Sequence, residues 1–148
     1  MKHLNKGRTL GRPREQRRAL LNSLFSSLVL HKRIEVTLAK AKEMKPFSEK
    51  MITKAKKKNL ASIRLLKKRL SKQAAKELFD RVAPAVKKRK GGYIRIIRKG
   101  WRESDGAEMA LVLLVDFSEA LEAGVSTDKK DKIKNKKNKQ SIKDNEKQ

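Results

Sequence analysis

The most informative part of this sequence is GGYIRIIRKGWRESDGAEMALVLLVDF, residues Gly91–Phe117. It contains two short runs rich in Ile, Val, Leu and Tyr, separated by a polar segment with Gly100 and Gly106. Such runs are typical of β-strands, and the glycine-containing segment predicts a hairpin loop longer than a two-residue turn. The second run, Glu108–Phe117, is almost continuously apolar, which favours a central strand covered by helices.

The first run differs because basic residues interrupt it, namely Arg95, Arg98, Lys99 and Arg102. A strand buried in a core does not tolerate that many charged groups unless their heads reach water or an anionic partner. The hairpin is therefore expected to have one strand that builds the core and a neighbour that offers a contact surface.

Apolar residues at helical spacing predict four helices outside the hairpin, and one alternating stretch predicts another strand. The helices are expected at Pro13–His31, Thr37 to about Lys57, Leu60–Leu70 and Ser71 to about Val82, and the strand at Arg33–Leu38. Pro46 predicts a kink or break near Lys45, because an interior proline costs about 3 kcal/mol. Pro84 is expected to close the fourth helix. The resulting order, α-β-α-α-α-β-β, belongs to the α+β class.

Composition predicts three parts of the chain. Residues 1–12 form a basic N-terminal arm with too little apolar surface to fold alone. Residues 13–123 are expected to form a single α/β domain, and residues 124–148 a Lys-rich, disordered tail. The last 24 residues hold nine Lys and four acidic residues, so +20 of the net charge of +25 belongs to residues 1–124.

The charge balance predicts a polyanionic partner, because 41 Lys and Arg stand against 16 Asp and Glu in 148 residues. A membrane is disfavoured, since no run approaches the roughly 18 apolar residues of a spanning helix and no secretion signal opens the chain. Cysteine is absent, which excludes disulfides, Cys-ligated zinc and a Cys nucleophile.

Neither catalysis nor cofactor binding is predicted. The two histidines, His3 and His31, and the scattered acidic residues form no pattern that would hold a metal or transfer a proton. Gly91-Gly92 neither follows a strand nor opens a helix, so it is not interpreted as a phosphate-binding loop. We therefore expect no catalytic, metal or cofactor residues, no small-molecule substrate and no enzyme.

The residues expected to contact nucleic acid lie in two regions, the arm with the first helical turn and the basic hairpin strand. They are Lys2, His3, Lys6, Arg8, Arg12, Arg14, Arg17, Arg18, Arg95, Arg98, Lys99, Trp101 and Arg102. Arginine predominates, and its planar fork suits bidentate contact with phosphate. Trp101 has two interpretations that are compatible with each other: partly buried packing, which is the commoner role of a lone Trp, and stacking on a base or sugar while Arg102 pairs with phosphate.

Several short motifs, in this order and spacing, resemble one known family. They are Gly7-Arg8, Leu10, Arg12, Arg17 and Ala19 near the start, Ala41-Lys42-Glu43 in the second helix, and Gly91-Gly92-Tyr93, Gly100-Trp101-Arg102, Asp105, Met109-Ala110 and Val115-Asp116 in the hairpin. The sequence resembles the bacterial large-subunit ribosomal protein seventeen family. It departs from the family pattern at Gln16, where members have His.

The resemblance implies a two-layer α/β sandwich, with about four helices on one face of a small mixed sheet. It also implies a structural constituent of the cytoplasmic large ribosomal subunit that binds and stabilises folded large-subunit rRNA. Neighbouring ribosomal proteins are then further partners, and no homo-oligomer is expected. The residues alone leave open a DNA-organising nucleoid protein, although no dimer surface or apolar wedge is evident, and an RNA-modifying enzyme, although no catalytic cluster is evident.

Overall fold

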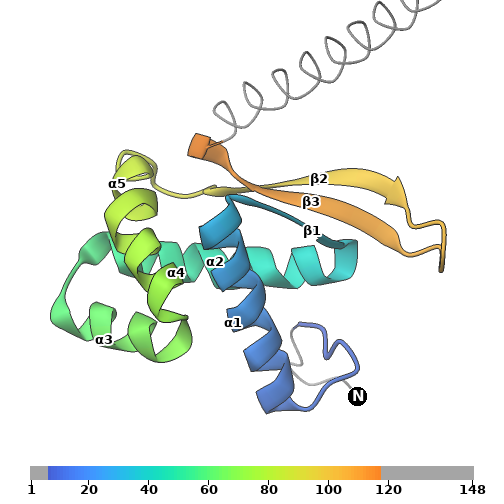
Figure 1. Cartoon of the computed structure of the whole chain (residues 1–148), viewed down its shortest axis with the longest axis horizontal. Helices are drawn as coiled ribbons and strands as arrows, with labels where there is room; N and C mark the ends of the chain where they lie inside the picture. The colour runs from blue at the N-terminus through green and yellow to red at the C-terminus, as the bar shows by residue number, and fades with distance from the viewer. Residues whose placement is uncertain (1–6, 118–148) are drawn as a thin grey trace, which may run out of the picture. The chain divides into compact units, whose positions relative to one another are not determined.

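The computed structural model describes residues 7–117 (Figure 1). Its elements, in chain order, are α1 (Arg14–His31), β1 (Arg33–Thr37), α2 (Leu38–Lys57), α3 (Leu60–Arg69), α4 (Lys72–Glu77), the π turn η1 (Leu78–Val82), α5 (Ala83–Ala85), β2 (Ile94–Trp101), β3 (Glu108–Leu114) and the 3-10 turn η2 (Val115–Phe117). The described residues 7–116 lie in one compact unit. The predicted tail, residues 124–148, lies outside the described residues.

The three strands form one sheet in the order β1-β3-β2. Both pairings are antiparallel, with Ile34 and Ile96 on either side of Val112. The predicted α+β class and element order are confirmed. The prediction of a mixed sheet is wrong. The strands β1 and β2 run in the same direction, but the most apolar strand, β3, lies between them. No parallel pair is therefore in contact.

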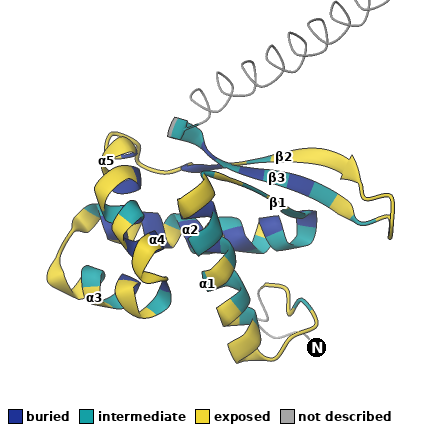
Figure 2. Cartoon of the chain, in the orientation of Figure 1, coloured by how far each residue is buried: buried dark blue, intermediate teal, exposed yellow. Residues whose placement is uncertain are grey.

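Helices cover one face of the sheet, with α2 running along it (Figure 1). The side chains of Ala110, Val112 and Leu114 on β3 are fully buried against this layer. Leu111 and Leu113, which alternate with them, lie on the opposite face and are only partly buried. Figure 2 shows the buried residues gathered where the helices meet the sheet. This period-two alternation is expected for an antiparallel sheet with one covered face.

The helix α2 continues through Pro46 without a break, so a break near Lys45 is wrong, and the alternative of a kink stays a prediction. Along its 20 residues, α2 buries seven side chains against the sheet and the other helices. Pro46 itself is exposed, so water can reach the backbone group that loses its helical partner. Packing over the full helix therefore outweighs the local cost of the proline. Thr37 occupies the N-cap position as predicted, but its side chain makes no capping hydrogen bond.

The fourth helical stretch extends to Ala85 rather than ending near Val82, so the expectation that Pro84 closes it is wrong. A π turn precedes the proline, and the Ala83 N–H donates to the Leu78 carbonyl five residues earlier. This wider turn changes the hydrogen-bond register immediately before a residue that has no N–H to donate. The helix can therefore include Pro84.

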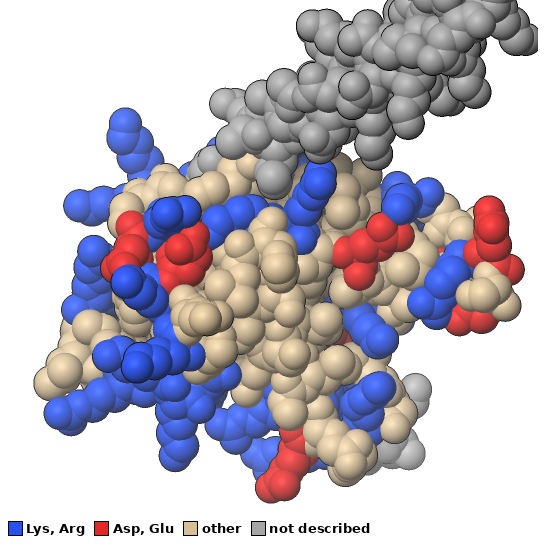
Figure 3. Space-filling model, in the orientation of Figure 1, with Lys and Arg blue, Asp and Glu red and all other residues tan. Residues whose placement is uncertain are grey.

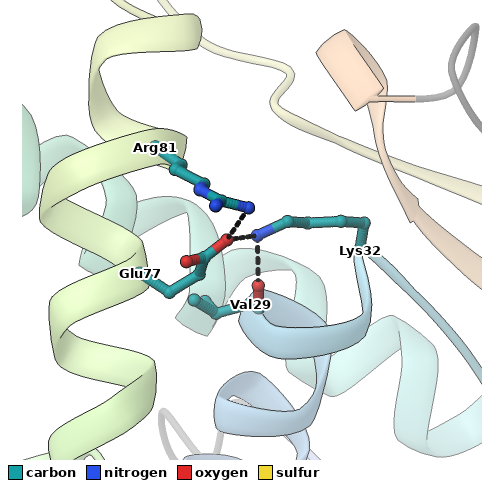
Figure 4. Close-up of polar contacts among 4 residues, drawn as sticks. All are labelled: Val29, Lys32, Glu77 and Arg81. Carbon is teal, nitrogen blue, oxygen red and sulfur yellow. Dashed lines mark hydrogen bonds and ion pairs between the residues drawn. The ribbon is translucent and has the colours of Figure 1, made fainter.

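A partly buried ion pair between Lys32 and Glu77 joins the end of α1 to α4 (Figure 4). Lys32 Nζ lies 2.7 Å from Glu77 Oε1 and also donates to the Val29 carbonyl at 2.7 Å. Arg81 Nη1 lies 3.6 Å from the same carboxylate oxygen. The hydrogen bond from Lys32 lowers the pKa of Glu77 below its ordinary value of 4.5. The Lys32 side chain is only 14% exposed, so this contact is shielded from water more than a surface ion pair.

Replacing Glu77 with Gln should lower the free energy of unfolding by about 1–2 kcal/mol at neutral pH, because Lys32 loses its charged partner. The folded-state pKa of Glu77 is depressed, so its contribution is present above about pH 4.5 and is lost as the pH falls through the lowered pKa. The difference between wild type and Glu77→Gln in urea unfolding should therefore vanish at low pH. Arg81→Gln, which removes the more exposed partner, should change stability by less than about 0.5 kcal/mol.

Pro46→Ala should raise the free energy of unfolding by about 1–3 kcal/mol, because it restores a helical hydrogen bond and removes a steric conflict at an exposed position. The urea unfolding midpoint measures this change. Lys50→Ala, an exposed position on the same helix, is the control and should stay within about 0.5 kcal/mol of wild type. Destabilisation by Pro46→Ala would show that the proline is required for the path of α2.

Candidate nucleic-acid interface

The described part of the arm, residues 7–12, contacts the helices through Arg8. Arg8 Nε lies 3.9 Å from Glu43 Oε1 on α2. Gly7 has φ +91°, and a Cβ atom at this position would lie 3.3 Å from Glu43 Oε2. Arg17 Nη1 on α1 donates to the Arg8 carbonyl at 3.4 Å. Arg8 is thus positioned by both α1 and α2. Lys2, His3 and Lys6 lie outside the described residues.

The arm and the hairpin meet at the first turn of α2, where two hollows share Leu38 and Glu108. The arm hollow, about 270 Å³, is lined by Arg8, Thr37, Leu38, Ala39, Lys42, Ala107 and Glu108. The hairpin hollow, about 300 Å³, is lined by Leu38, Arg98, Gly100, Trp101, Glu108 and Met109. The start of a long helix favours anions because of its dipole. Arg8, Lys42 and Arg98 add positive charge around it, and Glu108 opposes them.

Trp101 ends β2 and pairs with Glu108 on β3. Its side chain is 72% exposed, so the interpretation of Trp101 as partly buried packing is wrong. The reason is positional, because Trp101 lies at the tip of the hairpin, past the end of the helical layer. The indole borders the hairpin hollow, where its ring is available to a ligand.

The cations of β2 point to two different faces of the sheet, which the sequence did not distinguish. Arg98 pairs with the buried Ala110 and lines the hairpin hollow beside α2. Arg95 pairs with Leu113 and therefore lies on the helix-free face. A β-bulge between Arg98 and Gly100 shifts the register, and Lys99 Nζ reaches Glu35 Oε2 on β1 at 2.6 Å. The predicted single contact surface is therefore divided between the two faces.

Arg102 is held within the hairpin loop by Asp105. Its Nε and Nη2 atoms lie 2.8 and 2.6 Å from the two Asp105 carboxylate oxygens. The Asp105 carboxylate also accepts from the Ala107 N–H at 3.2 Å. The hydrogen bonds from Arg102 and then Ala107 lower the pKa of Asp105 to about 2, and the same pair raises the pKa of Arg102. Asp105 therefore stays ionised at neutral pH. Its carboxylate occupies the guanidinium donors of Arg102, which was predicted to contact RNA.

The remaining predicted cations lie on exposed surface near the start of α1. Arg12, Arg14 and Arg18 are exposed, and Arg17 is half-buried. Arg12 Nη1 donates to the Leu10 carbonyl at 3.0 Å, within the turn that precedes α1. These arginines extend the cationic surface beyond the arm hollow, but they do not line it.

The site prediction did not include one strongly cationic part of the body. Residues 50–76, the acid-free segment, contain eleven Lys and Arg and no Asp or Glu. They span the end of α2, all of α3 and most of α4. Figure 3 shows Lys and Arg gathered over α3, α4 and α5 with one small acidic cluster, whereas acidic and basic side chains are interspersed at the hairpin tip. The signal available in the sequence was the absence of acids, not the presence of a run of cations.

Lys56 attaches the turn before β2 to this cationic surface. Its Nζ atom donates to the Arg89 carbonyl and, at 3.2 Å, contacts the Tyr93 hydroxyl. It also lies 5.1 Å from the centre of the Tyr93 ring. The basic residues Lys87, Lys88 and Lys90, all exposed, are thereby held beside the end of α2.

Within residues 7–117, no group of three His, Asp or Glu side chains is close enough to hold a metal ion. In the same part of the chain, no helix combines the length and the apolar character needed to cross a lipid bilayer.

The α+β body and its cation-rich surfaces define a small basic protein suited to electrostatic contact with a polyanion. A family model for ribosomal protein L17 matches residues 20–115. Large ribosomal subunit protein bL17 of Methylacidiphilum infernorum (isolate V4) is 48% identical over 113 residues, covering 76% of this chain and 86% of that protein. Its namesake from Gemmatimonas aurantiaca is 48% identical over 116 residues, covering 78% and 98%. The chain belongs to the ribosomal protein L17 family, which confirms the resemblance seen in its motifs.

The Asp105 carboxylate should titrate near pH 2 in an NMR titration, below its ordinary value of 3.8, because Arg102 holds its charged form. Arg102→Gln should move the midpoint most of the way back toward the ordinary value. Arg102→Lys keeps the charge but loses the two-pronged geometry, so it should give an intermediate midpoint. A midpoint still near 2 in Arg102→Gln would assign the shift to the Ala107 N–H instead.

Proposed function

We propose that this chain is a non-catalytic structural constituent of the bacterial large ribosomal subunit. It binds and stabilises folded large-subunit rRNA through phosphate contacts, in the cytoplasm, with neighbouring large-subunit ribosomal proteins as further partners. Family membership and relatives named as large-subunit proteins support the subunit assignment. In this proposal residues 1–12 act as an arm, residues 13–123 as the RNA-binding domain and residues 124–148 as a basic extension.

The observation that carries the RNA part is the meeting of arm and hairpin at the start of α2. Arg8 and Arg98 come from distant parts of the sequence and border adjoining hollows. Their guanidinium groups offer forked donors to phosphate oxygens, and the positive end of α2 adds to the attraction. Trp101 presents an exposed aromatic ring at the rim of the hairpin hollow. This combination suits a folded RNA whose backbone and an unstacked base or sugar are contacted together.

Binding of this kind reduces the repulsion between RNA segments brought close together. Each phosphate neutralised by Arg or Lys releases condensed counterions, so affinity depends steeply on salt. The folded α+β body fixes the positions of the cations, and these positions determine which RNA geometry fits. The protein therefore acts by holding a particular packing of RNA.

The affinity of the full chain for large-subunit rRNA should fall by about 10³ to 10⁵ between 50 and 200 mM salt if six to ten phosphates are contacted. Arg98→Gln should reduce the slope of log affinity against log salt by about one. Arg81→Gln is the control, an exposed arginine that lines neither these two hollows nor any other hollow shared with Arg98, and it should leave the slope nearly unchanged. Filter binding or fluorescence anisotropy across a salt series measures both.

Two outcomes would contradict the proposal. A salt-insensitive association would remove phosphate neutralisation as the source of affinity. A preference for duplex DNA over folded rRNA at matched salt would favour a DNA-organising protein. Co-sedimentation with large but not small ribosomal subunits after a high-salt wash tests the subunit assignment separately.

A further inference from the structure

A further hollow, of different character, lies between α3 and the helical stretch α4–η1, mostly on the acid-free segment. It has a volume of about 790 Å³ and is lined by Ile63, Lys67, Lys72, Gln73, Ala75, Lys76, Phe79 and Asp80. We call it the α3–α4 groove. None of its residues lines the arm hollow or the hairpin hollow. It is therefore separate from the surface on which the proposed function rests.

The floor of the α3–α4 groove is apolar. Ala75 is 2% exposed, and Ile63 and Phe79 are partly exposed. Phe79 lies one turn after Ala75 on the same helical stretch, so the two share a face. Phe25, by contrast, is fully buried, and its ring centre lies 6.4 Å from that of Phe47. Phe79 thus leaves part of an aromatic ring open at the surface.

The π turn places Phe79 and Asp80 in this groove. Both residues belong to η1, where the Ala83 N–H bonds the Leu78 carbonyl with π-helical spacing. Such turns are rare and occur frequently at functional sites, because the extra residue re-aims the side chains of one turn. The two residues that the π turn presents are the aromatic and the only acidic member of the lining.

The rim of the groove is cationic. Lys67 lies on α3, and Lys72 and Lys76 lie one turn apart on α4, and all of these side chains are exposed. Within residues 7–117 these lysines form no ion pair, and Asp80 is the one acid that lines the groove with them. An apolar, aromatic floor with a lysine rim matches a nucleotide, which combines an apolar ring face with a negative phosphate.

We infer that the α3–α4 groove binds one unstacked base of a single-stranded RNA segment. The base lies against Phe79, and the adjoining phosphates contact the rim lysines. This inference rests on the proposed function, because RNA is the ligand in both. It adds a base-specific contact on α3, α4 and η1 to the phosphate contacts proposed for the arm and the hairpin.

Asp80 favours a base over an acidic peptide as the occupant. A carboxylate at the edge of the groove repels Asp and Glu side chains of a protein partner. The same carboxylate accepts a hydrogen bond from an exocyclic amine, as found for Asp and Glu with cytosine. A nucleotide whose base carries an amine therefore fits both kinds of side chain: its phosphate contacts the lysines, and its amine donates to Asp80. The groove is expected to prefer cytosine to uracil, which lacks that amine.

The test compares single-stranded oligocytidylate, oligouridylate and an abasic oligonucleotide of equal length, using the full chain. Trp101→Leu serves as the background, so that the other exposed aromatic does not contribute. In that background the chain should bind oligocytidylate about five- to a hundred-fold more tightly than the abasic probe. Adding Phe79→Leu should reduce this ratio to near one while leaving abasic binding unchanged. Asp80→Ala should remove the preference for cytidylate over uridylate.

The rim lysines give an independent readout. Replacing Lys67, Lys72 and Lys76 together with Gln should reduce the salt slope for oligocytidylate by about two, given roughly 0.7 per phosphate on single strands. Lys50, Lys54 and Lys58 are exposed lysines of the same segment outside the groove. Replacing these with Gln is the matched control, and it should leave the ratio of cytidylate to abasic affinity unchanged. Thermal unfolding by circular dichroism confirms that each variant is folded.

Failure of this inference is distinguishable from failure of the proposed function. If the chain binds large-subunit rRNA with the expected salt slope but Phe79→Leu keeps the base preference, the groove assignment is overturned alone. If the chain shows no salt-dependent rRNA binding, the proposed function fails with it. If the groove variants keep all RNA binding but lose a crosslink to a neighbouring protein in reconstituted subunits, the groove is a protein contact and the inference is overturned.

Discussion

The burial of β3 in the middle of the sheet is the constraint on which the rest of the structure depends. Ala110, Val112 and Leu114 form its fully buried face, and each must pack against α2 or its neighbours to leave water. Because β3 pairs on both edges, β1 and β2 take the outer positions. The helices then cover one face of the sheet. The cations of the chain are consequently distributed over outer strands, exposed helix faces and connecting turns.

This arrangement explains why so basic a chain can fold around a modest core. The long cationic side chains extend into solvent, and the few acids are placed where they stabilise the fold. Glu77 joins α1 to α4 through Lys32, Glu35 joins β1 to β2 through Lys99, and Asp105 closes the hairpin loop through Arg102. Most of the other Lys and Arg residues in the described part of the chain are exposed. They provide the surface charge that an RNA backbone can neutralise.

The distribution of acids also separates two surfaces of different chemistry. Around the start of α2, arginines from the arm and hairpin are mixed with Glu43 and Glu108, and this mixture suits contacts of defined geometry. Over α3 and α4, lysines surround an apolar groove in which Asp80 is the one acidic lining residue. Lysine is a mobile point charge, whereas arginine presents a rigid fork. The first surface is therefore suited to orient RNA and the second to hold a flexible single-stranded segment.

Local patterns in the sequence determined the order and type of the elements, the α+β class, the cationic excess and the membership of the L17 family. These properties follow from apolar periodicity, composition and motif order, all of which act over short distances along the chain. Even so, Pro46 and Pro84 did not act as the sequence predicted, because the packing of α2 and the π turn at Leu78–Val82 overrode a local preference.

Only the tertiary structure decided that β3 is central, that Arg98 and Arg95 lie on opposite faces, that Trp101 is exposed and that Arg8 meets the hairpin. Each of these depends on contacts between residues far apart in sequence, which no local pattern encodes. The α3–α4 groove is a further case, since its floor exists only when two helices pack side by side.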